Sequence, residues 1–178
     1  MTIEDKYLEK CSDPACADIS ENLCHLKDYA SKYEVIVEMG VRHIVSTWAL
    51  LAGKPLKLTS IDIVPPVEYG SNIEEVYQMS KTEGINFEFV LGNTLLIEIE
   101  ECDMLFIDTY HTYEHLQREL ELHAPKVKHC LAFHDTVSFP GVYQAVLEFV
   151  EEHKEWSVDL HKENNNGMTF LIKHQQNK

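Results

Sequence analysis

Short apolar runs alternate along this chain with longer segments in which apolar residues recur at helical spacing. The first run, residues 33–39, is rich in β-branched residues and is typical of a strand covered on both faces. Further strands are expected over 56–63, 85–91, 102–107 and 129–133. Helices are expected over 46–52, 71–83, 112–126 and 142–153, and Ser46-Thr47 can cap the first of them.

The two ends of the chain complete this pattern. Residues 3–30 predict helices that are interrupted near Pro14, and strands over 156–161 and 168–174 flank an Asn-Gly turn, which predicts an antiparallel hairpin. Alternating strands and helices require right-handed crossovers and a largely parallel sheet. We therefore expect one α/β domain over 1–178, with a doubly wound, mostly parallel, seven-stranded sheet, the C-terminal hairpin and helices on both faces. Its expected parts are a helical segment over 1–30, a core over 33–174 and a frayed tail over 175–178.

Composition limits the binding partners and the cellular compartment that we expect for this protein. At 178 residues the chain has the length of a single domain. Its 30 acidic and 15 basic residues give a net charge of -15, and such a surface repels phosphate backbones, so we expect no nucleic-acid partner. The five cysteines form no C-x-x-C pair, which argues against a disulfide framework or a cysteine zinc site. Neither a signal peptide nor a membrane-spanning run is evident, so we expect a cytoplasmic protein without a membrane partner.

Polar residues follow each of the five central strands, where open α/β sheets bind their ligands. They are Glu38 to Gly40, Asp62, Gly92 to Thr94, Asp108 with His111, and His134-Asp135. The first turn lacks the G-x-G-x-x-G pattern that a dinucleotide's pyrophosphate requires, so NAD and FAD are not expected. A carboxylate after the second strand suits the two hydroxyls of a ribose. The pattern therefore favours a nucleoside cofactor that has no phosphates and carries a positive charge.

Three motifs carry a resemblance to a known family. Residues 37–42 and 46–51 resemble the first motif of class I S-adenosylmethionine-dependent methyltransferases, which have a Rossmann-like fold. The run DMLFIDTYHTY over 103–113 is similar to the D-x-x-F-I-D-G-x-H-x-Y signature of one branch, and Ala132 to Thr136 is similar to its H-D motif. That branch includes the macrolide-sugar O-methyltransferases and the proteins named cephalosporin hydroxylases. The resemblance spans roughly 34–140 and implies O-methylation of a hydroxyl on a sugar or another small molecule.

The resemblance also implies roles for individual residues. Glu38 and Gly40 would line the methionine part of S-adenosylmethionine, Asp62 would bind the ribose, and Asn93-Thr94 would lie near the adenine. The implied cofactor-binding set is Glu38, Gly40, Ser46, Asp62, Asn93, Thr94 and Asp108. The implied ligands of a Mg²⁺ ion are Asp108, His134 and Asp135. Asp108 and His111 form the catalytic pair, in which His111 is the general base, since an unperturbed pKa near 6.5 leaves a histidine mostly neutral at pH 7.

Three departures from the branch leave questions open. Ile44 and Thr109 stand where glycine is usual, and Ile44 is expected to crowd the turn beside the cofactor because glycine allows close backbone approach. The position of His134 is often a carboxylate in metal-dependent members, and Mg²⁺ prefers oxygen ligands. The sequence therefore leaves open whether Mg²⁺ is bound.

Two alternative functions also remain. Ile44 is compatible with a catalytically silent binding module of the same fold. The run His111-Thr112-Tyr113-Glu114-His115 fits the H-x-x-E-H pattern of a zinc hydrolase, although that pattern has to lie within a helix and here it follows a strand. The chain lacks the large insertions that often cover the acceptor, so we expect either a compact site or a homo-oligomer that completes the pocket.

Overall fold

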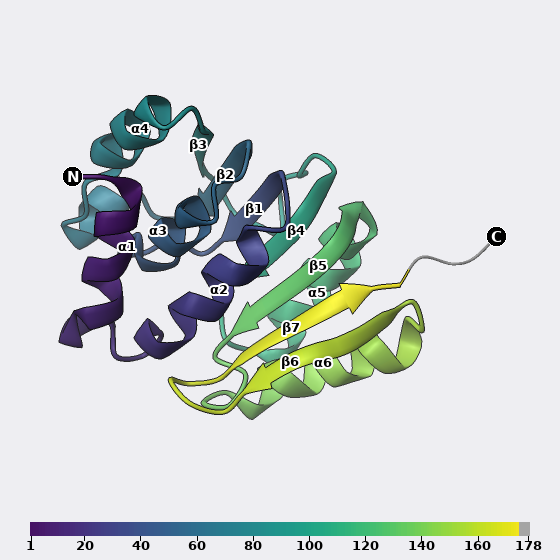
Figure 1. Ribbon diagram of the computed structural model, residues 1–178. Helices are drawn as coiled ribbons and strands as arrows, with labels where there is room; N and C mark the ends of the chain where they lie inside the picture. The colour runs from purple at the N-terminus through teal and green to yellow at the C-terminus, as the bar shows by residue number, and fades with distance from the viewer. Residues whose placement is uncertain (175–178) are drawn as a thin grey trace.

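A seven-stranded sheet forms the centre of the computed structural model, which describes residues 1–174 (Figure 1). Its strand order is β3-β2-β1-β4-β5-β7-β6. The strands are β1 (Val35–Met39), β2 (Lys57–Asp62), β3 (Asn86–Leu91), β4 (Cys102–Ile107), β5 (Val127–His134), β6 (Trp156–Lys162) and β7 (Met168–Lys173). The first five strands are parallel, whereas β7 pairs antiparallel with both β5 and β6. The predicted fold class is confirmed.

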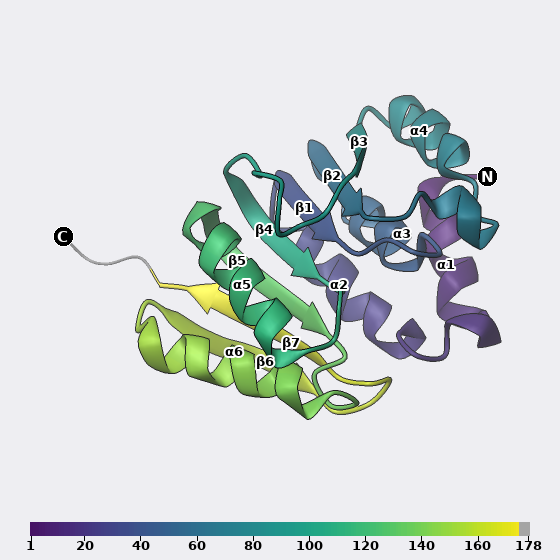
Figure 2. The ribbon, with the colours of Figure 1, turned by 180° about the vertical axis from the view of Figure 1, so that it is seen from behind.

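Helices cover both faces of this sheet. They are α1 (Ile3–Ser12), α2 (Leu23–Ala30), α3 (Val45–Ala52), α4 (Ile73–Thr82), α5 (Tyr113–His123) and α6 (Pro140–Glu152). Helices α1, α2 and α3 lie on one face, and α5 and α6 lie on the other, as the views from the front and from behind show (Figures 1 and 2). Short 3-10 turns occupy Pro14–Cys16, Ser20–Asn22, Pro66–Tyr69 and Ala124–Lys126.

Side chains of the central strands alternate between two apolar cores. In β4, Met104 and Phe106 pack with α1, α2 and α3, whereas Leu105 and Ile107 pack with α5 and α6. This period of two follows from the pleat of a strand, and it explains why buried parallel strands read as continuous apolar runs. Because β1 to β5 all run in the same direction, the polar residues that follow these five strands lie at the same end of the sheet.

Some local predictions need correction or lie outside the described part. Ser46 and Thr47 do not cap α3, because the helix begins at Val45 and its N-cap is Ile44 in the left-handed region, at φ 62. The tail 175–178 lies outside the described residues. Within residues 1–174 no helix has the length and apolar character that crossing a membrane requires.

The direction of the strand connections places a cleft between β1 and β4. From β1 the chain moves outward through β2 to β3, and it then returns to the other side of β1 as β4 and continues to β5. The connections therefore diverge between these two central strands, at the point where open α/β sheets bind ligands.

Candidate functional site

A cleft of about 400 Å³ opens at the carboxyl ends of the five parallel strands. It contains most of the site residues that the sequence predicts. Those that line it are Gly40, Asp62, Asn93, Thr94, Asp108, His111, His134 and Asp135. Glu38 and Ser46 do not line it. The topology has thus brought together residues that are separated by nearly a hundred positions in the chain.

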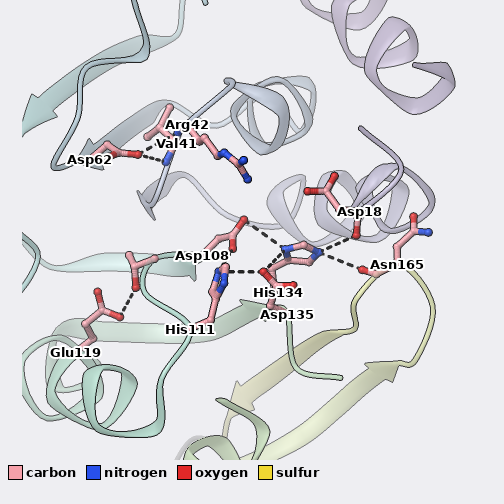
Figure 3. Close-up of polar contacts among 11 residues, drawn as sticks. Asp18, Val41, Arg42, Asp62, Asp108, His111, Glu119, His134, Asp135 and Asn165 are labelled. Carbon is pink, nitrogen blue, oxygen red and sulfur yellow. Dashed lines mark hydrogen bonds and ion pairs between the residues drawn. The ribbon is translucent and has the colours of Figure 1, made fainter. Parts of the chain in front are cut away.

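His111 lies between two carboxylates in this cleft (Figure 3). Its Nε2 is 3.2 Å from Asp108 Oδ1 and 2.9 Å from Asp135 Oδ2. Carboxylates accept hydrogen bonds, so Nε2 carries a proton. The hydrogen bonds to Asp108 and Asp135 outweigh the effect of burial and raise the pKa of His111 to about 9. The expectation of a mostly neutral His111 at pH 7 is therefore wrong for this arrangement, in which the imidazolium predominates.

His134 is hydrogen-bonded through one ring nitrogen and faces two carboxylates with the other. Its Nε2 lies 3.1 Å from the backbone oxygens of Asp18 and Asn165, which can only accept, so this nitrogen is also protonated. Its Nδ1 faces Asp108 Oδ2 at 3.4 Å and Asp135 Oδ2 at 3.5 Å. Burial lowers the pKa of His134, but the hydrogen bonds and charges of the two carboxylates outweigh it and raise this pKa to about 11. His134 is thus a buried cation that ties the N-terminal segment and the β6–β7 loop to the site.

These contacts bear on whether Mg²⁺ fits the site. Two imidazolium rings already neutralise the charges of Asp108 and Asp135, and the pKa of each carboxyl is lowered because the histidine hydrogen bonds outweigh burial. Within residues 1–174, the side chains that come close enough to share an ion are Asp108, His111 and Asp135, and His134 is not among them. Mg²⁺ prefers an all-oxygen shell, so an imidazole-bridged pair of carboxylates is a poor match. The residues therefore do not fit Mg²⁺.

The turn between β1 and α3 approaches the end of β4 closely. A Cβ on Gly40, which has φ +88, would lie 1.9 Å from the backbone oxygen of Asp108, so only glycine is tolerated there. Asp62 holds the same turn, because its Oδ2 accepts from the backbone nitrogens of Val41 at 2.7 Å and Arg42 at 3.0 Å. Its Oδ1 accepts from the backbone nitrogen of Val64 at 2.9 Å, so both oxygens of Asp62 already accept hydrogen bonds from the protein and only their remaining lone pairs face the cleft.

Glu38 is buried next to this turn. It is 0% exposed and accepts hydrogen bonds from Ser46 at 2.5 Å, Thr47 at 2.8 Å and Ser60 at 2.5 Å. Burial raises the pKa of Glu38 to about 7, although the three hydroxyls act against it. Ile44 is also buried, in the core beside α3, and does not crowd the cleft as the sequence led us to expect. The left-handed backbone of Ile44 still destabilises the fold, by roughly 1–2 kcal/mol.

Glu119 is a buried acid of the site that the sequence analysis does not select. It is 0% exposed on α5 and accepts from Thr94 Oγ1 at 2.5 Å and Thr109 Oγ1 at 2.8 Å. His115 Nε2 lies 3.2 Å from the same carboxylate. Glu119 therefore orients three cleft residues at once, and Thr109, which replaces the usual glycine, has a structural partner.

A signal for Glu119 was present in the sequence. The buried side of α5 carries Leu116 and Leu120, and Glu119 falls three residues after the first of these. A carboxylate on the apolar stripe of an amphipathic helix has to find hydrogen-bond donors, because an unpaired buried charge is costly. The break in the apolar stripe thus marks a polar network.

The zinc-hydrolase alternative is wrong. His111 precedes α5, which begins at Tyr113, so the H-x-x-E-H run does not lie within a helix. Glu114 is exposed, and His115 pairs with Glu119 whereas His111 pairs with Asp108 and Asp135. The two histidines therefore serve different networks.

Comparison with known proteins agrees with this architecture. No protein-family model and no curated protein matches the sequence. Among solved structures, a putative caffeoyl-CoA O-methyltransferase from Staphylococcus aureus is 15% identical with a TM-score of 0.68, over 86% of this chain and 83% of that one. An O-methyltransferase from Bacillus cereus, solved in complex with S-adenosylhomocysteine (SAH), is 11% identical with a TM-score of 0.63, over 96% and 90%.

A third similar structure is the O-methyltransferase TomG from Streptomyces achromogenes, which is involved in tomaymycin synthesis and was solved in complex with S-adenosylmethionine (SAM). It is 14% identical with a TM-score of 0.64, over 97% of this chain and 90% of that one. At such identities the likeness establishes the fold. The chain has the Rossmann-like fold of the class I SAM-dependent methyltransferases.

Proposed function

We propose that this protein transfers a methyl group from SAM to a hydroxyl of a small molecule. The observation that carries the proposal is the position of His111, which two carboxylates hold at the strand ends, inside a cleft at the switch point of a methyltransferase fold. A histidine fixed in this way serves proton transfer better than binding alone. This favours an enzyme over a catalytically silent module.

The cleft suits a cofactor with a positive charge and a nucleoside. Asp18 and Asp62 line it and form no ion pair within residues 1–174, whereas Asp108 and Asp135 are paired with histidines, so a cation gains mainly from Asp18 and Asp62. Bound SAM would supply a methyl group on a positively charged sulfur, which needs little further activation. Asp62 would accept from the ribose hydroxyls with its remaining capacity, and Asn93 lies at the end of β3 beside it. Alignment of this kind contributes at most about 7–11 kcal/mol to lowering the barrier.

His111 receives the proton of the acceptor. Bound SAM would give its methyl carbon to the acceptor oxygen and keep the carbon–sulfur electrons on sulfur, and the hydroxyl proton would pass to the imidazole of His111. Nε2–H faces Asp108 and Asp135, so Nδ1 of neutral His111 is the nitrogen that takes this proton. Asp108 and Asp135 orient the ring and stabilise the imidazolium that forms.

The surroundings of His111 favour an acceptor with a flat apolar face. The ring of Phe139 lies against His111, with centroids 4.6 Å apart. Tyr110 is 68% exposed and lines the cleft together with His111. An aromatic ring, or a sugar that presents its C–H face, would bury this surface while its hydroxyl reaches His111.

Calorimetry with SAH and a transfer assay with radiolabelled SAM over a panel of phenols and sugars test the proposal. We expect wild-type protein to bind SAH and to methylate a hydroxyl acceptor. The His111→Asn variant should bind SAH equally well but lose about 10²- to 10⁴-fold in kcat. His153→Asn, which alters a histidine at the end of α6 outside the cleft, is the control and should leave kcat unchanged.

The pH dependence gives a second readout. Because the pKa of His111 is raised to about 9, the neutral base is a minority at pH 7, and kcat/KM should rise about tenfold per pH unit until about pH 9. Absence of SAH binding would refute the cofactor assignment. Binding without transfer to any acceptor would favour the silent module, and full activity of His111→Asn would refute the role of His111.

A further inference from the structure

Arg42 is the one lysine or arginine among the residues that line the cleft within the described chain. It lies in the turn between β1 and α3, and its side chain extends toward the side of the cleft that holds Asp18, Asp108 and His134 (Figure 3). Its guanidinium makes no ion pair or hydrogen bond with any residue in 1–174, whereas most other cations of the chain face an acid. A permanent positive charge is thus left without a partner at the mouth of an acidic site.

The backbone fixes where this charge is presented. Asp62 Oδ2 accepts from both Val41 N and Arg42 N, and Arg42 itself is in the left-handed region at φ 44. Because hydrogen bonds hold the turn at two successive backbone amides, only the side-chain torsions of Arg42 remain free to change. The guanidinium can therefore reach a ligand in the cleft without rearrangement of the main chain.

The ligand that matches Arg42 is a carboxylate. A guanidinium presents a planar fork of N–H donors that pairs with both oxygens of a carboxylate. Elsewhere in the lining, Asp18 and Asp62 repel anions, and the imidazolium rings of His111 and His134 are already paired with Asp108 and Asp135. An anionic group of a bound molecule can therefore be accommodated beside Arg42 and is disfavoured elsewhere in the cleft.

SAM has one carboxylate, and we propose that Arg42 binds it. This inference rests on the proposed function. The strand order places Asp62 and Asn93 on one side of the β1 turn and Asp108 with His111 on the other. With its carboxylate at Arg42 and its ribose at Asp62, the cofactor would hold the sulfonium next to the end of β4, where the acceptor meets His111.

The experiment compares two ligands that differ by the carboxylate alone. Calorimetry at low salt would measure SAH and decarboxylated SAH on wild-type protein, on Arg42→Gln and on Arg42→Lys. Arg118→Gln is the control, because Arg118 is an exposed arginine on α5 that pairs with Glu121 away from the cleft. Thermal melts of all variants would verify that each is folded.

We expect wild type to bind SAH about 10- to 100-fold more tightly than its decarboxylated analogue, as for a hydrogen bond to a charged group. Arg42→Gln should abolish that preference by weakening SAH alone, Arg42→Lys should keep part of it, and Arg118→Gln should keep all of it. Equal weakening of both ligands would mean that Arg42 only shapes the turn, and unchanged SAH affinity would mean that it faces an anionic acceptor; either result overturns the inference. Failure of wild type to bind either ligand would refute the proposed cofactor itself.

Discussion

Glu38 makes the stability of this protein depend on pH in a way that a single substitution can isolate. Its carboxyl group is completely buried under the turn between β1 and α3 and contacts three hydroxyls, from Ser46, Thr47 and Ser60. Glu38→Gln keeps the shape of the side chain and can exchange hydrogen bonds with the same hydroxyls, but it cannot ionise. The variant therefore removes the charge and leaves the packing in place.

The magnitude follows from the pKa of Glu38, which burial raises from 4.5 to about 7. A carboxyl whose pKa is higher in the folded state stabilises the fold while it is protonated, and this stability is lost as the pH rises from about 4.5 through about 7. One pKa unit corresponds to about 1.4 kcal/mol, so the complete loss is about 3 kcal/mol. Over that range Glu38 should lower the free energy of unfolding by up to about 1.4 kcal/mol per pH unit.

Urea denaturation at half-unit steps from pH 4.5 to 8 would measure this effect. The quantity of interest is the free energy of unfolding of Glu38→Gln minus that of wild type, since the titration of the histidines cancels in the difference. It should grow by about 3 kcal/mol across the series, whereas Glu114→Gln, at an exposed glutamate, should give a flat difference. A flat difference for Glu38→Gln would refute the raised pKa and the protonated carboxyl with it.

Three further predictions concern the turns and the charges around the cleft. Gly40→Ala should lower the free energy of unfolding, measured by urea denaturation, by about 3 kcal/mol or more, because its Cβ would meet the Asp108 carbonyl. The control Gly70→Ala, also at positive φ but with open space around it, should lower it by about 1 kcal/mol, and equal losses would contradict the close approach at Gly40. His134→Asp should create Mg²⁺ binding that calorimetry detects and wild type lacks, since it replaces a buried cation with a third carboxylate; stoichiometric binding by wild type would contradict this. Asn22→Ala should lower the free energy of unfolding by about 1–3 kcal/mol and speed hydrogen exchange in the 163–167 loop, because the Asn22 side chain donates a hydrogen bond to the Asn164 carbonyl. Unchanged exchange would contradict this role of the hydrogen bond.

The order of helices and strands could be read from the chain because each element is marked locally. The apolar run 102–107 coincides with β4, and the hairpin of β6 and β7 forms around the Asn-Gly turn. The start of α3 could not be read in this way. Ser46 and Thr47 have the chemistry of helix caps, but the helix starts before them from a left-handed Ile44, a conformation that propensity does not predict.

The site residues likewise divide into those that the sequence predicts and those whose state depends on tertiary contacts. Asp108 and His111 are predictable because they sit three residues apart at the end of an apolar run, and the fold has only to turn that end toward the cleft. The protonation state of His111 was not predictable, because its pKa depends on contact with Asp108 and also on Asp135, which follows the next strand of the sheet. His134 likewise has its ring fixed by backbone oxygens from segments more than a hundred residues upstream and about thirty residues downstream.

The sequence by itself therefore determined the element order, the strand ends that carry polar residues and the class of fold, since these depend on periodicity and on neighbouring residues. Tertiary structure alone decided which of those polar groups are free to meet a ligand. It buried Glu38 against three hydroxyls, placed His134 beside two carboxylates and left the Arg42 guanidinium without a partner among residues 1–174. The physical reason is that charge and hydrogen bonding act through space, between residues that the chain places far apart.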